Sequence, residues 1–248
     1  MGLAWVLGPT VQVRHPPNMA TVLSAVDGPV AACVGAMGGI LEGVLILAFV
    51  TPERYRRSDE VDAPVRDRHW VPVWTVLACV AIAVSWRTSP VFMVILLVWM
   101  APMVAACVVD VDVHRLPDVL TLSMFVVLAV CLAALAVSTS SWPALGRAFC
   151  AAAIVLVVFL LLGLVGGGAG MGMGDVKLSA SIGLVMGYLS WVHVFFAVLA
   201  AALIGSVWGL GLRIVRGREA SLEFAFGPHL VAGAQLVLVL PVVAGVWT

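Results

Sequence analysis

Charged residues are scarce in this sequence. They make up 10% of its 248 residues, against 63% hydrophobic residues, whereas soluble domains carry roughly 25% charged residues. The formal net charge is zero and no basic cluster interleaved with aromatics is present, so no nucleic-acid partner is indicated. Instead, runs of about 20 apolar residues recur, each long enough to cross a bilayer as a helix. The chain is predicted to be an all-α polytopic integral membrane protein, with the lipid bilayer as a partner.

Two further absences exclude thiolate-metal and nucleotide sites. The five cysteines lie far apart within apolar runs and form no C-x-x-C pair, so neither a zinc knuckle nor a redox motif is present. The glycine-rich stretch GGGAGMGMGDVKLS (166–179) contains neither G-x-x-x-x-G-K-[ST] nor G-x-G-x-x-G, which argues against a phosphate cradle. No cofactor and no metal ion are expected.

About eight transmembrane helices are predicted, or six to seven if two adjacent short spans form one broken element. If the spans alternate, ten of the thirteen Lys and Arg residues fall on one side, which the positive-inside rule makes cytosolic. Both termini are then outside, and the junctions at 110–117 and 166–177 lie on the cytosolic face. The predicted spans are 26–50, 71–86, 91–109, 118–137, 147–165, 177–189, 191–212 and 228–247.

The first group of polar residues that could perform chemistry lies between the third and fourth of these spans. The sequence CVVDVDVHRLPDVLTL (107–122) carries Asp110, Asp112, His114 and Asp118 between apolar runs. Pro117 pushes the preceding residue out of helical conformation and starts the next segment. If 110–114 is helical, Asp110 and His114 share a face while Asp112 points elsewhere.

The second polar group is the glycine-rich stretch, which ends in Asp175 and the single lysine of the chain, Lys177. Gly172 and Gly174 remove side chains next to Asp175, and Gly174 would let an extended substrate strand lie against it. Lys177 is expected to balance charge, to meet a substrate carboxylate or to anchor the helix at the interface. Asp175 and Asp110 would lie at the same membrane face. Because two close carboxylates retain one proton between them, they could activate water and polarise a peptide carbonyl.

These two groups resemble the motifs of one family. GMGMGDVKL (170–178) resembles the GxGD motif of the type IV prepilin peptidases, membrane aspartyl proteases that include archaeal preflagellin peptidases. DVDVHRLPD (110–118) looks like the family's other aspartate motif, and FAFGPHLVAG (224–233) resembles the stretch that opens its last helix. The resemblance implies a catalytic pair, Asp110 and Asp175. The matching positions that would support the pair or bind substrate are Gly172, Gly174, Lys177, Asp112, His114, Pro117 and Asp118.

The resemblance also implies a substrate and a location. Family members remove a short basic leader from prepilin-like proteins with a hydrophobic N-terminal helix, at the cytosolic face of the bacterial plasma (inner) membrane. Residues 1–25 would form an extracytoplasmic segment, 26–248 the membrane-embedded peptidase domain, and 51–70 a short cytosolic loop. Many bacterial members carry a cysteine-rich domain in that loop, associated with N-methylation. Because 51–70 contains no cysteine, peptidase activity is expected and methyltransferase activity is not.

Two other functions stay open from the residues alone. Asp110, Asp112 and His114 alternate, so in an extended conformation they could hold a divalent ion in a metal-dependent membrane transferase. That hypothesis predicts loss of activity with a chelator and an essential Asp112. A proton-coupled transporter could use Glu42, Asp110 and Asp175 along a pathway of broken helices. Glu42 stands where the family usually has asparagine, and its role stays open.

Overall fold

The computed structural model describes residues 26–53, 55–56, 67–113, 116–165, 172–216 and 226–240. These residues form eight α-helices and no β-strand, which confirms the predicted all-α class. The helices are α1 (Gly28–Val50), α2 (Trp70–Ser85), α3 (Pro90–Val113), α4 (Asp118–Thr139), α5 (Trp142–Val165), α6 (Met173–Leu189), α7 (Trp191–Arg216) and α8 (Gly227–Val239).

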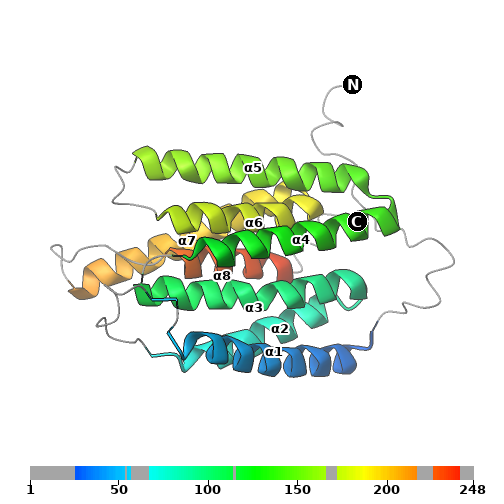
Figure 1. Ribbon diagram of the computed structural model, residues 1–248, viewed down its shortest axis with the longest axis horizontal. Helices are drawn as coiled ribbons and strands as arrows, with labels where there is room; N and C mark the ends of the chain where they lie inside the picture. The colour runs from blue at the N-terminus through cyan, green and yellow to red at the C-terminus, as the bar shows by residue number, and fades with distance from the viewer. Residues whose placement is uncertain are drawn as a thin grey trace.

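The helices lie side by side and alternate in direction (Figure 1). The C-terminal ends of α1, α3, α5 and α7 and the N-terminal ends of α2, α4, α6 and α8 gather at the left end of the bundle in Figure 1. The end of α3 and the start of α6 therefore share one end of the bundle, as alternating spans predict. The side of the membrane that this end faces stays a prediction.

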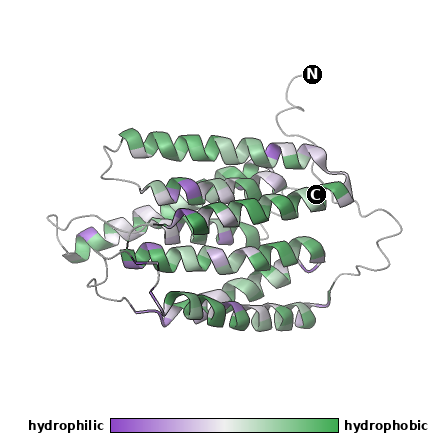
Figure 2. Ribbon diagram, in the orientation of Figure 1, coloured by the Kyte–Doolittle hydropathy of each residue, from purple (hydrophilic) through white to green (hydrophobic). Residues whose placement is uncertain are grey.

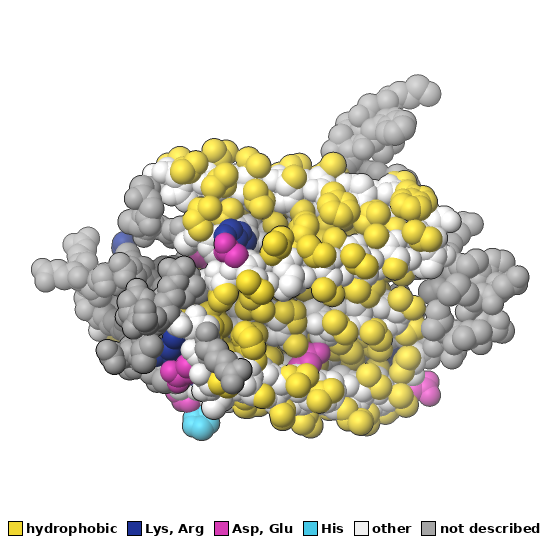
Figure 3. Space-filling model, in the orientation of Figure 1, with side chains coloured by type: hydrophobic (Ala, Val, Ile, Leu, Met, Phe, Trp, Pro, Cys, Tyr) yellow, Lys and Arg dark blue, Asp and Glu magenta, His cyan; other side chains and the backbone are white. Residues whose placement is uncertain are grey.

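The outer surface of the bundle is apolar, as contact with lipid requires. Hydrophobic residues dominate the helices in Figure 2 and cover most of the face drawn in Figure 3. Among the described helices, five are long and apolar enough to cross a membrane, namely α1, α3, α4, α5 and α7. α2 and α8 are shorter apolar helices, and α6 has 17 residues. The eight predicted spans thus correspond to eight helices, of which five have the length for a full crossing.

The buried helix α6 packs most closely against α5, and glycine permits the approach. A Cβ added at Gly183 would lie 2.9 Å from the Cα of Ala152, and one added at Gly187 would overlap the Cβ of Ala151. Small residues at this spacing allow helix backbones to approach closely in a membrane, where van der Waals packing replaces the hydrophobic effect between helices. The α5–α6 contact therefore fixes the position of α6, which carries Asp175 at its other end.

Arg147 of α5 closes the C-terminal end of α6. Its Nε donates to the carbonyl of Gly187 at 2.7 Å, and its Nη2 donates to the carbonyls of Tyr188 at 2.7 Å and Leu189 at 2.9 Å. The last carbonyls of a helix have no partner within the helix, and a cation at this end also opposes the negative end of the helix dipole. A single side chain thus satisfies the end of the helix and ties it to α5.

Candidate functional site

Two buried carboxylates meet at the N-terminal end of α8. Asp110 lies in the last turn of α3 and Asp175 in the first turn of α6, and they are 6% and 5% exposed. The peptide N–H of Gly227 donates to Oδ2 of Asp110 at 3.0 Å. A Cβ added at Gly227 would lie 2.7 Å from that oxygen and 3.4 Å from Oδ1 of Asp175. Both carboxylate oxygens therefore lie next to the position that a Cβ of Gly227 would occupy. The distance between the two oxygens is at most the sum of 2.7 Å and 3.4 Å.

The start of α6 is fitted to the segment that follows α3. A Cβ added at Gly174 would lie 2.7 Å from the Cβ of Leu116, so only glycine fits there without a shift. Gly172 caps α6, and its carbonyl accepts the N–H of Asp175 at 3.0 Å. The missing side chain of Gly174 faces Leu116, and the expectation that a substrate strand lies against this stretch stays a prediction. Gly174 holds α6, and with it Asp175, close to the end of α3.

The two carboxylates have different surroundings. Oδ2 of Asp110 accepts the Gly227 N–H. Oδ1 of Asp175 is buried and has no hydrogen-bond partner among the residues that the structure describes. Two buried carboxylates around one point repel each other when both are ionised, so such a pair holds one proton between its members. The arrangement can therefore supply one proton acceptor and one proton donor side by side.

Asp112 points away from this pair. Its Oδ2 lies 2.8 Å from Nη2 of Arg68 and accepts a hydrogen bond from the hydroxyl of Tyr55. Arg68 also donates to the Tyr55 hydroxyl at 2.9 Å and to the carbonyl of Val50 at 3.0 Å. The side chain of Asp112 thus joins the end of α3 to residues on both sides of the α1–α2 connection.

This placement overturns the extended Asp110–Asp112 arrangement that a metal site would need. Both residues belong to helix α3, so their side chains project in different directions. His114 lies outside the described residues. Within the described parts of the chain, no group of three or more His, Cys, Asp or Glu is placed to hold a metal ion.

Tyr55 contributes a neutral donor to this cluster. Burial raises its pKa to about 12, and the hydrogen bond to Asp112 and the charge of that carboxylate act in the same direction. The phenol therefore keeps its proton at neutral pH and donates to Asp112. A donor of this kind stabilises the buried carboxylate together with Arg68.

Lys177 and Asp118 form an ion pair at the surface, between the starts of α6 and α4. Their side chains are 40% and 74% exposed, in contrast to the buried Asp175 two residues before Lys177. Pro117 caps α4, and its carbonyl accepts the N–H of Leu120 at 3.0 Å. The ion pair borders a groove of about 350 Å³ lined also by Thr121, Leu122, Phe125, Leu156 and Ala180. Lys177 and Asp118 thus belong to the outer face of α6 and α4 rather than to the aspartate pair.

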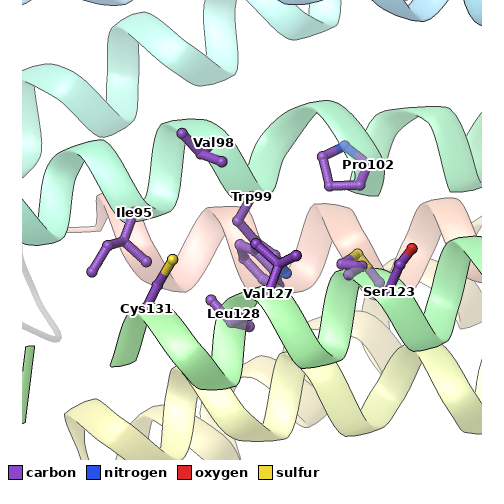
Figure 4. Close-up of a pocket in the computed structure, with 9 residues that line it drawn as sticks. Ile95, Val98, Trp99, Pro102, Ser123, Val127, Leu128 and Cys131 are labelled. Atoms are coloured by element: carbon purple, nitrogen blue, oxygen red, sulfur yellow. The ribbon is translucent and has the colours of Figure 1, made fainter. Parts of the chain in front are cut away.

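A second cavity and a further buried carboxylate lie apart from the pair. A cavity of about 180 Å³ opens between α3 and α4, lined by residues such as Trp99, Pro102 and Ser123, and none of its lining residues is charged (Figure 4). Glu42 of α1 accepts a hydrogen bond from Sγ of Cys79 in α2 at 3.5 Å. Neither feature joins Asp110 or Asp175 in the described contacts, so the aspartate pair is the candidate active site.

Sequence reasoning did not assign three of the residues that shape this region. Arg68 and Tyr55 were expected only as parts of a loop, and nothing in their spacing indicates that they reach Asp112. Gly227 belongs to the FGP stretch, whose resemblance to a family motif was a signal that the residue mattered. Its contact with Asp110 depends on how α8 packs against α3, which the sequence pattern alone does not specify.

Comparisons with known proteins agree with these motifs. The Type IV leader peptidase family matches residues 94–210, a range that includes both aspartates. A protein of Aeromonas hydrophila is 30% identical over 181 residues, which cover 71% of this chain and 59% of that protein. One of Pseudomonas aeruginosa is 31% identical over 148 residues, covering 58% of this chain and 48% of that protein. Both carry the name prepilin leader peptidase/N-methyltransferase.

A relative from Aeromonas salmonicida bears the same name and is 31% identical over 182 residues, 68% of this chain and 56% of that protein. The chain thus spans a little over half the length of the first two Aeromonas relatives. No solved structure is significantly similar to the chain.

Proposed function

The chain belongs to the type IV leader peptidase family, and we propose that it is a membrane aspartyl endopeptidase that removes the leader from prepilin-like proteins. One observation carries this proposal: Asp110 and Asp175, far apart in sequence, surround a single point at the start of α8 while buried from solvent. The family motifs and this convergence select the same two carboxylates.

In the proposed reaction, the ionised carboxylate takes a proton from water while the water oxygen bonds to the carbonyl carbon of the scissile peptide. The protonated carboxyl gives its proton to the carbonyl oxygen. The peptide C–N bond then breaks as the nitrogen takes the proton that came from water. One hydroxyl of the intermediate returns a proton to the other carboxylate, so both aspartates recover their starting states. The small exposure of both side chains keeps bulk water from competing with these transfers.

The proposed substrate is a protein whose hydrophobic N-terminal helix lies in the bilayer and whose basic leader lies at the cytosolic face. Basic residues support this orientation, since the end of the bundle that holds the aspartates also holds most of those described. Arg56 and Arg68 lie between α1 and α2, Lys177 lies at the start of α6, and Arg213 and Arg216 lie at the end of α7, whereas Arg87 lies between α2 and α3 and Arg147 at the start of α5, toward the opposite end. The bacterial inner membrane is the corresponding location.

We restrict the proposal to proteolysis. The relatives' names also include N-methyltransferase, but residues 51–70 of this chain contain no cysteine. The product of cleavage is therefore expected to carry an unmodified N-terminal amine. Mass spectrometry of the trimmed substrate after incubation with a methyl donor tests this point, and a mass increase of one methyl group would contradict it.

The decisive experiment is co-expression of the chain with a prepilin-like substrate, comparing wild type with Asp110→Asn and Asp175→Asn. Each substitution keeps the side-chain shape and removes the acid–base group, so leader removal is expected to fall about 100-fold or more. Asp67→Asn is the matched control, because Asp67 is 74% exposed and lies at the same end of the bundle. Undiminished cleavage by either active-site variant, or inhibition of wild type by a chelator, would refute the two-aspartate mechanism.

A further inference from the structure

Gly227 has an unusual position relative to the two aspartates. Its N–H donates to Asp110, and its missing side chain faces Oδ2 of Asp110 and Oδ1 of Asp175 together. Other tightly packed glycines face different obstacles. A Cβ at Gly233 would lie 2.5 Å from the backbone N of Ala201, and one at Gly205 would lie 2.8 Å from the ring of Phe226. Those two glycines allow helices and an aromatic ring to pack, whereas Gly227 borders the reacting groups.

The local structure explains why a free N–H is available at this position. Gly227 is the first residue of α8, and a proline follows it in the first turn. The first N–H groups of a helix have no intrahelical acceptor, and they point outward at the positive end of the helix dipole. The N–H of Gly227 donates to the buried carboxylate of Asp110. Such a bond favours the charged form of its acceptor.

The carboxylate of Asp175 differs from that of Asp110 in its hydrogen bonding. Asp175 directs toward the same point an oxygen that is buried and has no hydrogen-bond partner among the described residues. A buried polar atom without a partner is costly unless a ligand or water satisfies it. The oxygen therefore marks the side of the pair at which a water molecule or the substrate carbonyl is bound.

We propose that Gly227 is a positioning residue of the proteolytic site, in which its peptide N–H holds Asp110 as the ionised partner and its missing side chain leaves room for the attacking water between the two carboxylates. The inference rests on the proposed function, and it assigns the proton to Asp175. It also gives the FGP stretch a physical role. The start of α8 orients a side chain of α3 toward a side chain of α6.

The N–H can be tested separately from the space beside it. Incorporation of glycolic acid at position 227 replaces the peptide N–H by an ester oxygen and adds no atom to the site. Removal of a hydrogen bond to a charged group is expected to lower kcat about 10- to 100-fold with KM unchanged. The matched control is leucic acid at Leu230, whose N–H donates to the carbonyl of Phe226 and not to an aspartate. This control should retain kcat.

Gly227→Ala tests the role of the space that the missing side chain leaves beside the two carboxylates. Its Cβ would lie 2.7 Å from Oδ2 of Asp110, so the carboxylate must rotate and cleavage should be lost. Gly38→Ala is the control, since a Cβ there meets nothing within 4 Å. Thermal unfolding of each purified variant shows whether the fold persists. If the alanine variant does not fold, the ester variant still decides the role of the N–H.

The inference and the proposed function fail in distinguishable ways. Wild-type kcat in the glycolic acid variant, or a loss no larger than that of the Leu230 ester, overturns the role of the N–H. Full activity of Gly227→Ala overturns the role of the space. In both cases the proposed function stands as long as Asp110→Asn and Asp175→Asn are inactive. Activity in those two variants would refute the proposed function itself.

Discussion

Arg68 and Asp112 form an ion pair in which Nη2 lies 2.8 Å from Oδ2, with the Asp112 side chain 1% exposed and that of Arg68 13% exposed. The pair joins the residues that precede α2 to the last turn of α3. Asp110 occupies that same turn, two residues earlier and on a different side of the helix. Asp112 therefore anchors the turn that presents Asp110, and it does so without sharing the site of Asp110.

Substitutions in this pair should affect stability more than chemistry. Removing one partner leaves a buried charge uncompensated, which typically costs about 3–5 kcal/mol. We expect Asp112→Asn and Arg68→Met each to lower the midpoint of thermal unfolding clearly, and the double variant to lose less than the sum of the two. Cleavage per folded molecule should stay within about tenfold of wild type, since the acid–base pair is intact.

Circular dichroism melts and cleavage rates normalised to folded protein measure the two effects separately. The metal-dependent hypothesis gives the opposite result. It requires that Asp112→Asn abolish turnover in fully folded protein and that added divalent ions restore activity in chelated wild type.

The local features of the site were predictable because each depends on residues close together in sequence. Pro117 marks the break between α3 and α4, and most of the predicted spans agree with the helices to within four residues at each end. The start of α6 lies at Met173 and not at the predicted 177, and that of α5 lies at Trp142 and not at 147. The span predicted over 228–247 ends earlier, because α8 ends at Val239 and residues 241–247 lie outside the described parts of the chain. The glycines at the start of α6 predict a loop, but Gly174 is the second residue of α6 and packs beside Leu116. The weak helix propensity of glycine therefore does not mark where this helix begins.

The contacts between distant segments could not be predicted. Apolar patterning makes nearly all faces of a membrane helix alike, so it does not specify which helices are neighbours. The Arg68–Asp112 pair and the Gly227–Asp110 bond both depend on that arrangement. The convergence of Asp110 and Asp175 was expected from the family resemblance and from alternation of the spans. Their shared neighbour in α8 was not.

Gly187 is predicted to be essential for the packing of α6 on α5. An alanine Cβ would overlap that of Ala151 and approach the Cα of Ala148 to 3.0 Å. Because two backbones would have to separate, Gly187→Ala should destabilise the protein by about 1–3 kcal/mol. Gly146→Ala in α5 is the matched control, since nothing lies within 4 Å of a Cβ there. Equal unfolding midpoints for the two variants would contradict the proposed packing constraint.

The Lys177–Asp118 ion pair is predicted to contribute little to stability. Both side chains are substantially exposed, and exposed ion pairs contribute about 0–1 kcal/mol. Lys177→Met and Asp118→Asn should therefore shift the unfolding midpoint only slightly, with a small coupling in the double variant. Kinetics with a prepilin-like substrate test whether Lys177 also contributes to substrate binding. An increase in KM for Lys177→Met alone would show that Lys177 contacts the substrate, whereas equal KM values leave it as a surface anchor.

The end of the bundle that holds the aspartates is predicted to face the cytosol. In a variant with the five native cysteines replaced, single cysteines can be introduced by Asp67→Cys at this end and Thr88→Cys at the other, both at exposed positions. A membrane-impermeant maleimide added to intact spheroplasts should label the position 88 thiol at once and the position 67 thiol only after permeabilisation. The reverse pattern would place Asp110 and Asp175 outside the cell. Such a result would exclude leader removal at the cytosolic face while leaving the chemistry of the pair unchanged.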